Sequence, residues 1–257
     1  CINIVLIDTD PFDGRMDMKK LRDTIVDDDE GHGSTAIVLL TMGTTIRNAY
    51  DNLSEFYQTV VDDLTDVKFH VHIDGAFGGA IYPFFRSNWL LYPIDSFNLS
   101  FHKFLGCPFP CSLFITTKRV QNEIKGNGCF GKDMVCIPDK DYTVSCSRNG
   151  TAVLKMYEKI ISNPTFYSTH INNVIRCFQN KRYLIQKINK LVEYNNSNEL
   201  GLSVELLNLP CELEERLTKY GVNIRKNHST GLFDTHIYLC AHVTAELIDE
   251  FVKDLIS

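Results

Sequence analysis

The sequence predicts an α/β protein with a mostly parallel sheet and helices on both faces, followed by a small α+β domain. Three observations support this prediction. Short apolar runs alternate with amphipathic stretches over residues 1–120, which is typical of parallel strands buried between helices. Beyond residue 150, long amphipathic stretches separate isolated strands. The length of 257 residues suffices for one large and one small domain.

The first half contains five expected strands and two expected helices. A continuous β-branched and aliphatic run indicates a buried strand at Ala36–Leu40. Short segments that contain apolar residues indicate further strands at Ile4–Ile7, Phe69–Ile73, Ser96–Ser100 and Leu113–Thr116. Apolar residues at helical spacing indicate helices at Asp17–Ile25 and Leu53–Leu64. Strand and helix therefore alternate along this part of the chain, as a parallel sheet requires.

The second half starts with a stretch rich in Gly, Pro and Asp, Gly126–Asp141, which we expect to be a loop. Helical patterns follow at Thr151–Ile161, Ile171–Tyr194, Glu212–Tyr220 and after Thr244, the expected N-cap of the last helix. Strands are expected at Leu202–Leu207 and Thr235–Cys240. We therefore divide the chain into a large domain, residues 1–165, and a small domain, residues 166–257.

Composition narrows the choice of partners. The formal net charge of −6 argues against a nucleic acid or an anionic membrane as partner. No apolar run approaches the ~20 residues of a membrane span. The nine cysteines are irregularly spaced, which favours reduced thiols in the cytoplasm over disulfides or a zinc site. The chain opens with Cys1 in an apolar run, so we expect an amino-terminal part to be missing.

Two residues that follow predicted strands offer cofactor chemistry. Asp74 follows Phe69–Ile73, and Lys103 follows Ser96–Ser100. Ligands bind at the carboxyl ends of parallel strands, so both side chains should reach one cleft. A lysine ringed by Phe101, Phe104 and Leu105 would be partly desolvated, which lowers its pKa. Taken singly, Asp74 is also explained as a turn or N-cap residue and Lys103 as a surface lysine.

Together the pair suits pyridoxal 5'-phosphate (PLP). A lysine bonds the aldehyde of this cofactor, and a carboxylate keeps its pyridine nitrogen protonated. Ser100 and His102 lie beside the lysine and can donate hydrogen bonds to the phosphate. Thr44 and Thr45 follow another strand, so their hydroxyls can reach the same cleft. His70 and His72 share a face of their strand, where a metal site is less expected than packing beside Asp74.

Five segments resemble the group II PLP-dependent amino-acid decarboxylases. Residues 71–79 look like the H-V-D-G/A-A-x-G-G segment of that family, and residues 37–52 are similar to its G-T-T-x-x-G-A-x-D-x stretch. Residues 100–111 look like the S-G-H-K-F-x-G-x-P-x-P-C segment of its histidine decarboxylase and plant serine decarboxylase branch. Residues 147–150 match the S-R-N-G of that branch, and residues 242–244 resemble its carboxy-terminal end.

The resemblance implies fold type I of the PLP enzymes and loss of the α-carboxylate of an L-amino acid as CO₂. Histidine, giving histamine, is the first expectation for the substrate, and serine is the next. The resemblance also implies a homodimer with active sites at the subunit interface. It makes Lys103 the lysine that bonds PLP, Asp74 the partner of the pyridinium nitrogen, and Ala76 the residue that packs on the ring.

The remaining roles follow from the same resemblance. Ser100 and the catalytic His102 would lie near the phosphate, Thr45 near the ring hydroxyl, and Ser147 would face the substrate of the partner subunit. No metal is expected. The family has glycine where this chain has Phe101.

Two other functions remain open. The chain departs from the family pattern at Phe101 and lacks an assignable ring-stacking histidine, which the family places upstream of Cys1. It also lacks a clear tyrosine proton donor, since Cys136 aligns there and Tyr142 lies nearby. A truncated or catalytically inactive decarboxylase-like protein is therefore one alternative. Another fold type I enzyme, such as an aminotransferase, is the second.

Overall fold

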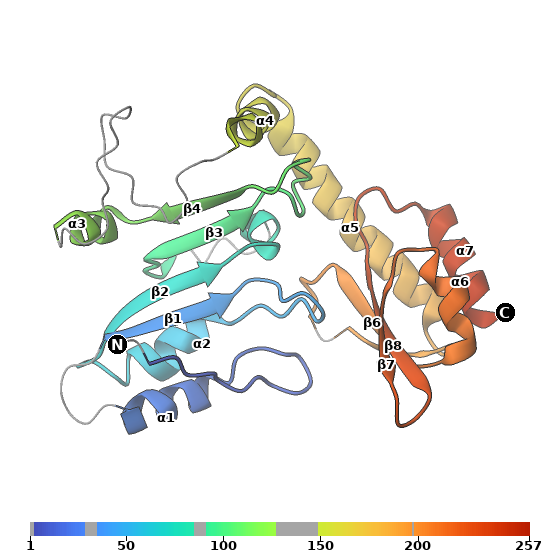
Figure 1. The fold of residues 1–257 in the computed structure, drawn as a ribbon, viewed down its shortest axis with the longest axis horizontal. Helices are drawn as coiled ribbons and strands as arrows, with labels where there is room; N and C mark the ends of the chain where they lie inside the picture. The colour runs from blue at the N-terminus through green and yellow to red at the C-terminus, as the bar shows by residue number, and fades with distance from the viewer. Residues whose placement is uncertain (1–2, 29–34, 85–90, 127–148, 197) are drawn as a thin grey trace.

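The computed structural model describes residues 3–28, 35–84, 91–126, 149–196 and 198–257. Two four-stranded sheets form the centres of two regions, which the long helix α5 (Phe166–Ile188) connects (Figure 1). Among the described residues, no helix combines the length and apolarity that crossing a bilayer requires.

The first sheet confirms the predicted α/β class. It contains β1 (Thr35–Thr41), β2 (Lys68–Asp74), β3 (Ser96–Ser100) and β4 (Ser112–Thr116), in that spatial order. β1 and β3 both pair parallel to β2, whereas β4 pairs antiparallel to β3. Parallel strands end at the same edge, so the segments after β1, β2 and β3 come together there.

Helices cover one face of this sheet in the part of the chain that the structure describes. That face packs against α1 (Met18–Asp28), α2 (Leu53–Phe56) and the π-helical turn η1 (Tyr57–Val61). On the opposite face, Ile37 and Leu39 of β1 remain 65% and 53% exposed. Among the described residues, helices are therefore found on one of the two faces on which they were expected.

Short helical segments lie beyond the strands of the first sheet. Those along the chain are η2 (Gly78–Ala80), η3 (Tyr82–Phe84), α3 (Lys118–Gly126) and α4 (Gly150–Ile160). Asn149 caps α4 by accepting a hydrogen bond from the amide of Thr151. Capping satisfies a donor that the first turn of a helix leaves unpaired.

The second region is α+β, as the sequence predicts. Its antiparallel sheet has the order β5-β6-β8-β7, with strands β5 (Glu193–Asn195), β6 (Ser203–Pro210), β7 (Asn223–Asn227) and β8 (Leu232–Tyr238). Three helical segments accompany it: η5 (Cys211–Leu213), α6 (Glu214–Thr218) and α7 (Ala245–Ile256). A cluster of buried side chains, among them Leu206 and Phe233, joins the sheet to α5, α6 and α7. Thr244 caps α7 by accepting from the amide of Leu247, which confirms the expected N-cap.

Asn48 joins the two regions. It is fully buried, at a φ of 49°, in the loop that follows β1. Its Nδ2 lies 3.0 Å from the hydroxyl of Ser203 and 3.2 Å from that of Tyr238. Its Oδ1 accepts from the amide of Leu202 at 3.1 Å. One side chain thus fixes the loop after β1 against β6 and β8.

Several predicted boundaries were wrong. Ile4–Ile7 forms no strand: Ile4 and Leu6 are 83% and 92% exposed, and no described strand pairs with them. The helix expected at Ile171–Tyr194 begins at Phe166 and ends at Ile188, because Lys190 turns the chain with a φ of 71°. Most of the loop expected at Gly126–Asp141 lies outside the described residues.

Other elements were divided or missed. The helix expected over Leu53–Leu64 is α2 followed by the π-helical η1. The one expected over Glu212–Tyr220 is η5 followed by the short α6. β5 and β7 were not predicted. β7 has little apolar character and reaches the sheet by pairing with β8 over five residues.

Candidate active site

The ends of β2 and β3 bring the predicted site residues onto one edge of the first sheet. Asp74 is the last residue of β2, and Ser100 is the last residue of β3. The amide of Gly75 donates to the carbonyl of Asn98 at 3.1 Å, and the amide of Ser100 donates to the carbonyl of Ala76 at 3.2 Å. Asp74, Ala76 and Ser100 therefore lie on adjoining segments.

Asp74 is held by its own turn and by the neighbouring strand. Its Oδ1 accepts from the amide of Ala76 at 3.0 Å and from Nδ2 of Asn98 at 3.1 Å. Both hydrogen bonds engage Oδ1, and none of the described residues donates to Oδ2, which is left for another donor. Gly75 is required here because a Cβ would lie 2.5 Å from a ring carbon of Phe97.

Lys103 lies in the turn that follows β3. Its amide donates to the carbonyl of Ser100 at 3.4 Å, and Gly106 completes the turn at a φ of 64°. The prediction that neighbouring side chains partly desolvate Lys103 was wrong for the residues that the structure describes. Its side chain is exposed, because Phe101 and Leu105 turn into the core, where they are 3% and 7% exposed.

Phe101 fits the turn without the backbone freedom of the family's glycine. The φ angle of Phe101 is not positive, so its backbone conformation is ordinary for an L-residue. Its ring packs with Ala80, Leu105 and Cys107 in a small buried cluster. The departure from the family pattern is therefore accommodated as a core residue of the turn.

Ser100 and His102 are both tied to the strand that follows them. The hydroxyl of Ser100 is buried, 3.4 Å from the hydroxyl of Ser112. Nδ1 of the exposed His102 lies 3.1 Å from the amide nitrogen of Cys111 and 3.0 Å from its carbonyl oxygen. These contacts fix the imidazole by Nδ1 and leave Nε2 for a ligand.

Thr44 and Thr45 lie in the loop after β1. The hydroxyl of Thr44 accepts from the amide of Ala49 at 2.9 Å, so it stabilises its own loop. Thr45 is exposed, and its carbonyl accepts a hydrogen bond from the hydroxyl of Tyr238. The structure thus places Thr45 beside β8, and no contact with Asp74 or Lys103 is recorded for it.

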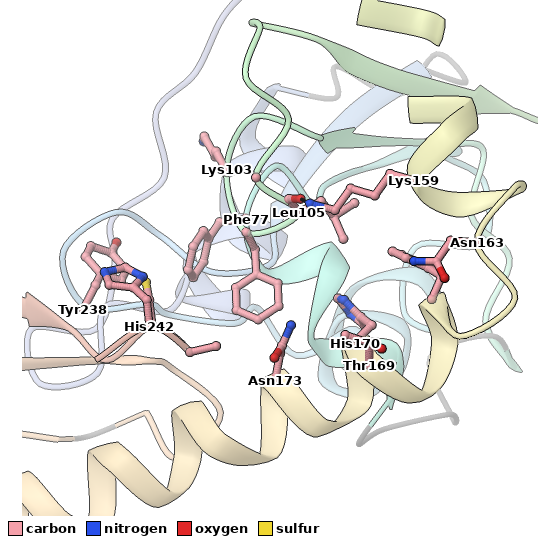
Figure 2. Close-up of a pocket in the computed structure, with 15 residues that line it drawn as sticks. Phe77, Lys103, Leu105, Lys159, Asn163, Thr169, His170, Asn173, Tyr238 and His242 are labelled. Carbon is pink, nitrogen blue, oxygen red and sulfur yellow. Dashed lines mark hydrogen bonds between the residues drawn. The ribbon is translucent and has the colours of Figure 1, made fainter. Parts of the chain in front are cut away.

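A cavity of about 730 Å³ opens beside Lys103, between the turn after β3, helix α5 and the segment after β8 (Figure 2). Of the predicted site residues that the structure describes, Lys103 alone lines it, and its side chain extends away from Asn173 and His170 of α5. Several lining side chains are basic or polar, and none is Asp or Glu: Lys103, Lys159, Asn163, Thr169, His170, Asn173, Tyr238 and His242.

The sequence did not predict the cavity residues from α5. His170 is buried, and its Nε2 lies 2.6 Å from the carbonyl oxygen of Ala80. Burial lowers the pKa of His170, against the effect of that hydrogen bond, and nearby Lys159 lowers it further. No pattern in the sequence indicates this site, since only tertiary packing brings α5 to the turn that carries Lys103.

The residues at this edge fit PLP by the chemistry of their donors and acceptors. Asp74 offers an oxygen to the pyridinium nitrogen, Lys103 has an exposed amine for the aldehyde, and His102 keeps one ring nitrogen for the phosphate. Ser147, together with Cys136 and Tyr142, lies outside the described residues.

Comparisons with known proteins agree on one family. The pyridoxal-dependent decarboxylase conserved domain matches residues 2–204. A serine decarboxylase of Oryza sativa subsp. japonica is 29% identical over 258 residues, 98% of this chain and 53% of its own length. A histidine decarboxylase of Raoultella ornithinolytica is 32% identical over 166 residues, 63% of this chain and 68% of its own length. The chain spans about half the length of the first curated relatives it matches.

Solved structures share the fold at low sequence identity. The L-methionine decarboxylase of Streptomyces sp. 590 superposes with a TM-score of 0.75 at 17% identity, covering 94% of this chain and 57% of that one. Mouse CSAD superposes with a TM-score of 0.74 at 20% identity, covering 97% and 57%. The fold-type expectation is therefore confirmed.

Proposed function

The chain belongs to the pyridoxal-dependent decarboxylase family, and on that premise we propose that it removes the α-carboxylate of an L-amino acid as CO₂. The observation that carries the proposal is that the carboxyl ends of β2 and β3 lie next to each other. The hydrogen bond from the amide of Ser100 to the carbonyl of Ala76 joins the segment after Asp74 to the one that leads to Lys103. A carboxylate and an amine on adjoining segments are what PLP binding requires.

Three residues would hold the ring of the cofactor. PLP supplies the electron sink that accepts the electron pair left when CO₂ departs. Lys103 would bond its aldehyde through the exposed amine. Asp74 would accept from the pyridinium nitrogen through Oδ2, since Oδ1 already accepts two hydrogen bonds. Ala76, next to that carboxylate, would pack on the ring.

Three further residues would serve the phosphate and the ring hydroxyl. His102 would donate from Nε2 to the phosphate, because contacts with Cys111 hold Nδ1. Ser100 would donate its hydroxyl to the same group. Thr45 would lie near the ring hydroxyl, and Ser147 would contact the substrate bound by the partner subunit.

The decisive experiment adds PLP to the purified chain and records its visible absorbance. We expect a band from lysine-bound cofactor that Lys103→Ala abolishes. Lys155→Ala is the matched control, because Lys155 is an exposed lysine on α4 that pairs with Glu158. A chain that gives no band, or a band that survives Lys103→Ala, would support the inactive decarboxylase-like alternative.

Histidine is the first proposed substrate and serine the second, because relatives of both kinds match this chain. The loaded protein should release one CO₂ per histamine formed, or one per ethanolamine if serine is the substrate. Transfer of the amino group to a keto acid without CO₂ would instead support the aminotransferase alternative.

The proposed assembly is a cytoplasmic homodimer with two domains, residues 1–165 and 166–257. The separate hydrophobic clusters around the two sheets support the domain division. The free cysteines found among the described residues are compatible with a reducing compartment. Sedimentation equilibrium tests the dimer: a species with the mass of one chain at micromolar concentration would contradict it.

A further inference from the structure

A chain of hydrogen-bonded side chains runs from Asp74 along the open face of the first sheet. Asn98 donates to Asp74 through Nδ2 at 3.1 Å, and its Oδ1 lies 3.2 Å from Nε2 of His72. Nδ1 of His72 lies 2.8 Å from the hydroxyl of Ser96, which is also 3.1 Å from Nε2 of His70. Alternate residues of two paired strands thus form one continuous polar network.

The direction of each hydrogen bond follows from the one at Asp74. A carboxylate only accepts, so Asn98 presents its NH₂ to Asp74 and its carbonyl oxygen to His72. His72 must then carry its proton on Nε2, and its Nδ1 accepts from Ser96. The hydroxyl oxygen of Ser96 can in turn accept from His70. Every donor points toward Asp74, an arrangement in which successive hydrogen bonds strengthen one another.

The surroundings of His72 favour the neutral ring that this direction requires. Burial is the main cause and lowers the pKa of His72. The hydrogen bond with Asn98 and the charge of Asp74 raise this pKa, and the neighbouring His70 lowers it. The net direction is downward, so His72 stays neutral at pH 7 with one nitrogen donating and one accepting.

The other strands contribute apolar neighbours to His72. Leu39 of β1 pairs with it in register, and the ring of Phe114 in β4 stacks on it with centroids 5.8 Å apart. Among the described residues, the charged or titratable groups that act on His72 are thus Asp74 and His70 of its own strand. Among the described residues, the hydrogen-bond partners that orient the imidazole are therefore Asn98 and Ser96.

We propose that Asn98 and His72 are positioning residues for Asp74. They hold Oδ1 through a polarised chain and present Oδ2 to the pyridinium nitrogen of the cofactor. The proposal rests on the proposed function, because only a bound PLP would benefit from that orientation. Neither residue touches the reacting atoms, so both act through Asp74.

The first test needs no cofactor. Long-range ¹H–¹⁵N spectra of the ¹⁵N-labelled chain at pH 7 should show His72 as a single tautomer with its proton on Nε2. Asn98→Ala should convert it to a mixture of tautomers, while Asn223→Ala, an exposed asparagine on β7, should leave it unchanged. A wild-type ring protonated on Nδ1, or a ring unaffected by Asn98→Ala, would overturn the proposal.

The second test uses the protein loaded with PLP. The visible absorbance of lysine-bound cofactor should change with pH at a different midpoint in Asn98→Ala and His72→Phe than in wild type. kcat should fall about tenfold, which is what one hydrogen bond to a charged group is worth, with KM nearly unchanged. Asn223→Ala should match wild type in both measurements.

The outcomes separate the two proposals. A wild-type chain without an absorbance band refutes the proposed function, whatever the tautomer of His72. A normal wild-type band with identical pH midpoints and kcat in both variants refutes the positioning role and leaves the proposed function intact.

Discussion

The two sheets differ in how completely they are covered. In the second sheet, side chains such as Leu206 and Phe233 are fully buried against α5, α6 and α7. In the first sheet, α1, α2 and η1 cover one face, and the other exposes Ile37 and Leu39 beside the polar chain that ends at Asp74. The candidate chemistry therefore lies on the face of the first sheet that the described residues leave uncovered.

The largest expected effect compares two strand leucines. Leu206→Ala removes a fully buried side chain from β6 and should lower the free energy of unfolding by about 2–5 kcal/mol. Leu39→Ala, at a position 53% exposed on β1, should cost about 0.5 kcal/mol or less. Urea unfolding of both variants measures this contrast, and equal losses would refute the difference in coverage between the two positions.

The second prediction concerns the pH dependence at the junction between the regions. Lys181 of α5 is 3% exposed, and its amine donates to the carbonyls of Asn198 and Gly201 at 2.8 and 2.6 Å. Burial lowers the pKa of Lys181 from 10.5 to about 8, partly opposed by the charge of Glu199. Between these values the unfolded chain binds more protons than the folded one, so stability should rise as pH rises.

The titration of Lys181 should raise the free energy of unfolding by at most about 3 kcal/mol between pH 8 and pH 10.5. Urea unfolding at several pH values measures it, and Lys181→Met is the matched control because it keeps a long side chain and removes the titrating amine. If wild type and Lys181→Met show the same pH dependence over this interval, Lys181 is not the group responsible.

Short-range sequence patterns predicted much of the fold, namely the elements for which the pattern agrees with the tertiary structure. The strand predicted at Phe69–Ile73 is β2, and Asp74 lies at its carboxyl end as expected. The capping threonine, Thr244, marked the start of α7. The strand predicted at Ile4–Ile7 was wrong because a strand also needs a neighbouring strand, which a local pattern does not reveal.

The candidate site was predictable only in part, for a related reason. Asp74 ends β2 and Lys103 follows β3, so the rule for strand ends found them. Asn98 was missed although it alternates with Ser96 and Ser100 on one face of β3, a period-two signal that could have revealed it. His170 could not be found, because α5 reaches the turn after β3 only in the folded molecule.

The third prediction tests the ordering of α7 in the well-covered region. Thr244→Ala removes the hydroxyl that accepts from the amide of Leu247 at 3.2 Å and should cost about 1 kcal/mol. Thr244→Ser keeps the acceptor and should cost much less. Thermal unfolding of the two variants distinguishes them, and an equal loss would show that the methyl group of Thr244 matters more than its hydroxyl.

The smallest expected effect is on the open face of the first sheet. Ile37→Thr replaces a side chain that is 65% exposed with another β-branched residue. The free energy of unfolding should therefore change by about 0.5 kcal/mol or less. Val38→Thr is the matched control on the covered face, where the residue is 4% exposed, and should cost about 1–3 kcal/mol for burying a hydroxyl. Both are measured by urea unfolding at two protein concentrations. A large, concentration-dependent loss in Ile37→Thr would mean that a second copy covers this face, and the contrast between the two sheets would then hold only for the isolated chain.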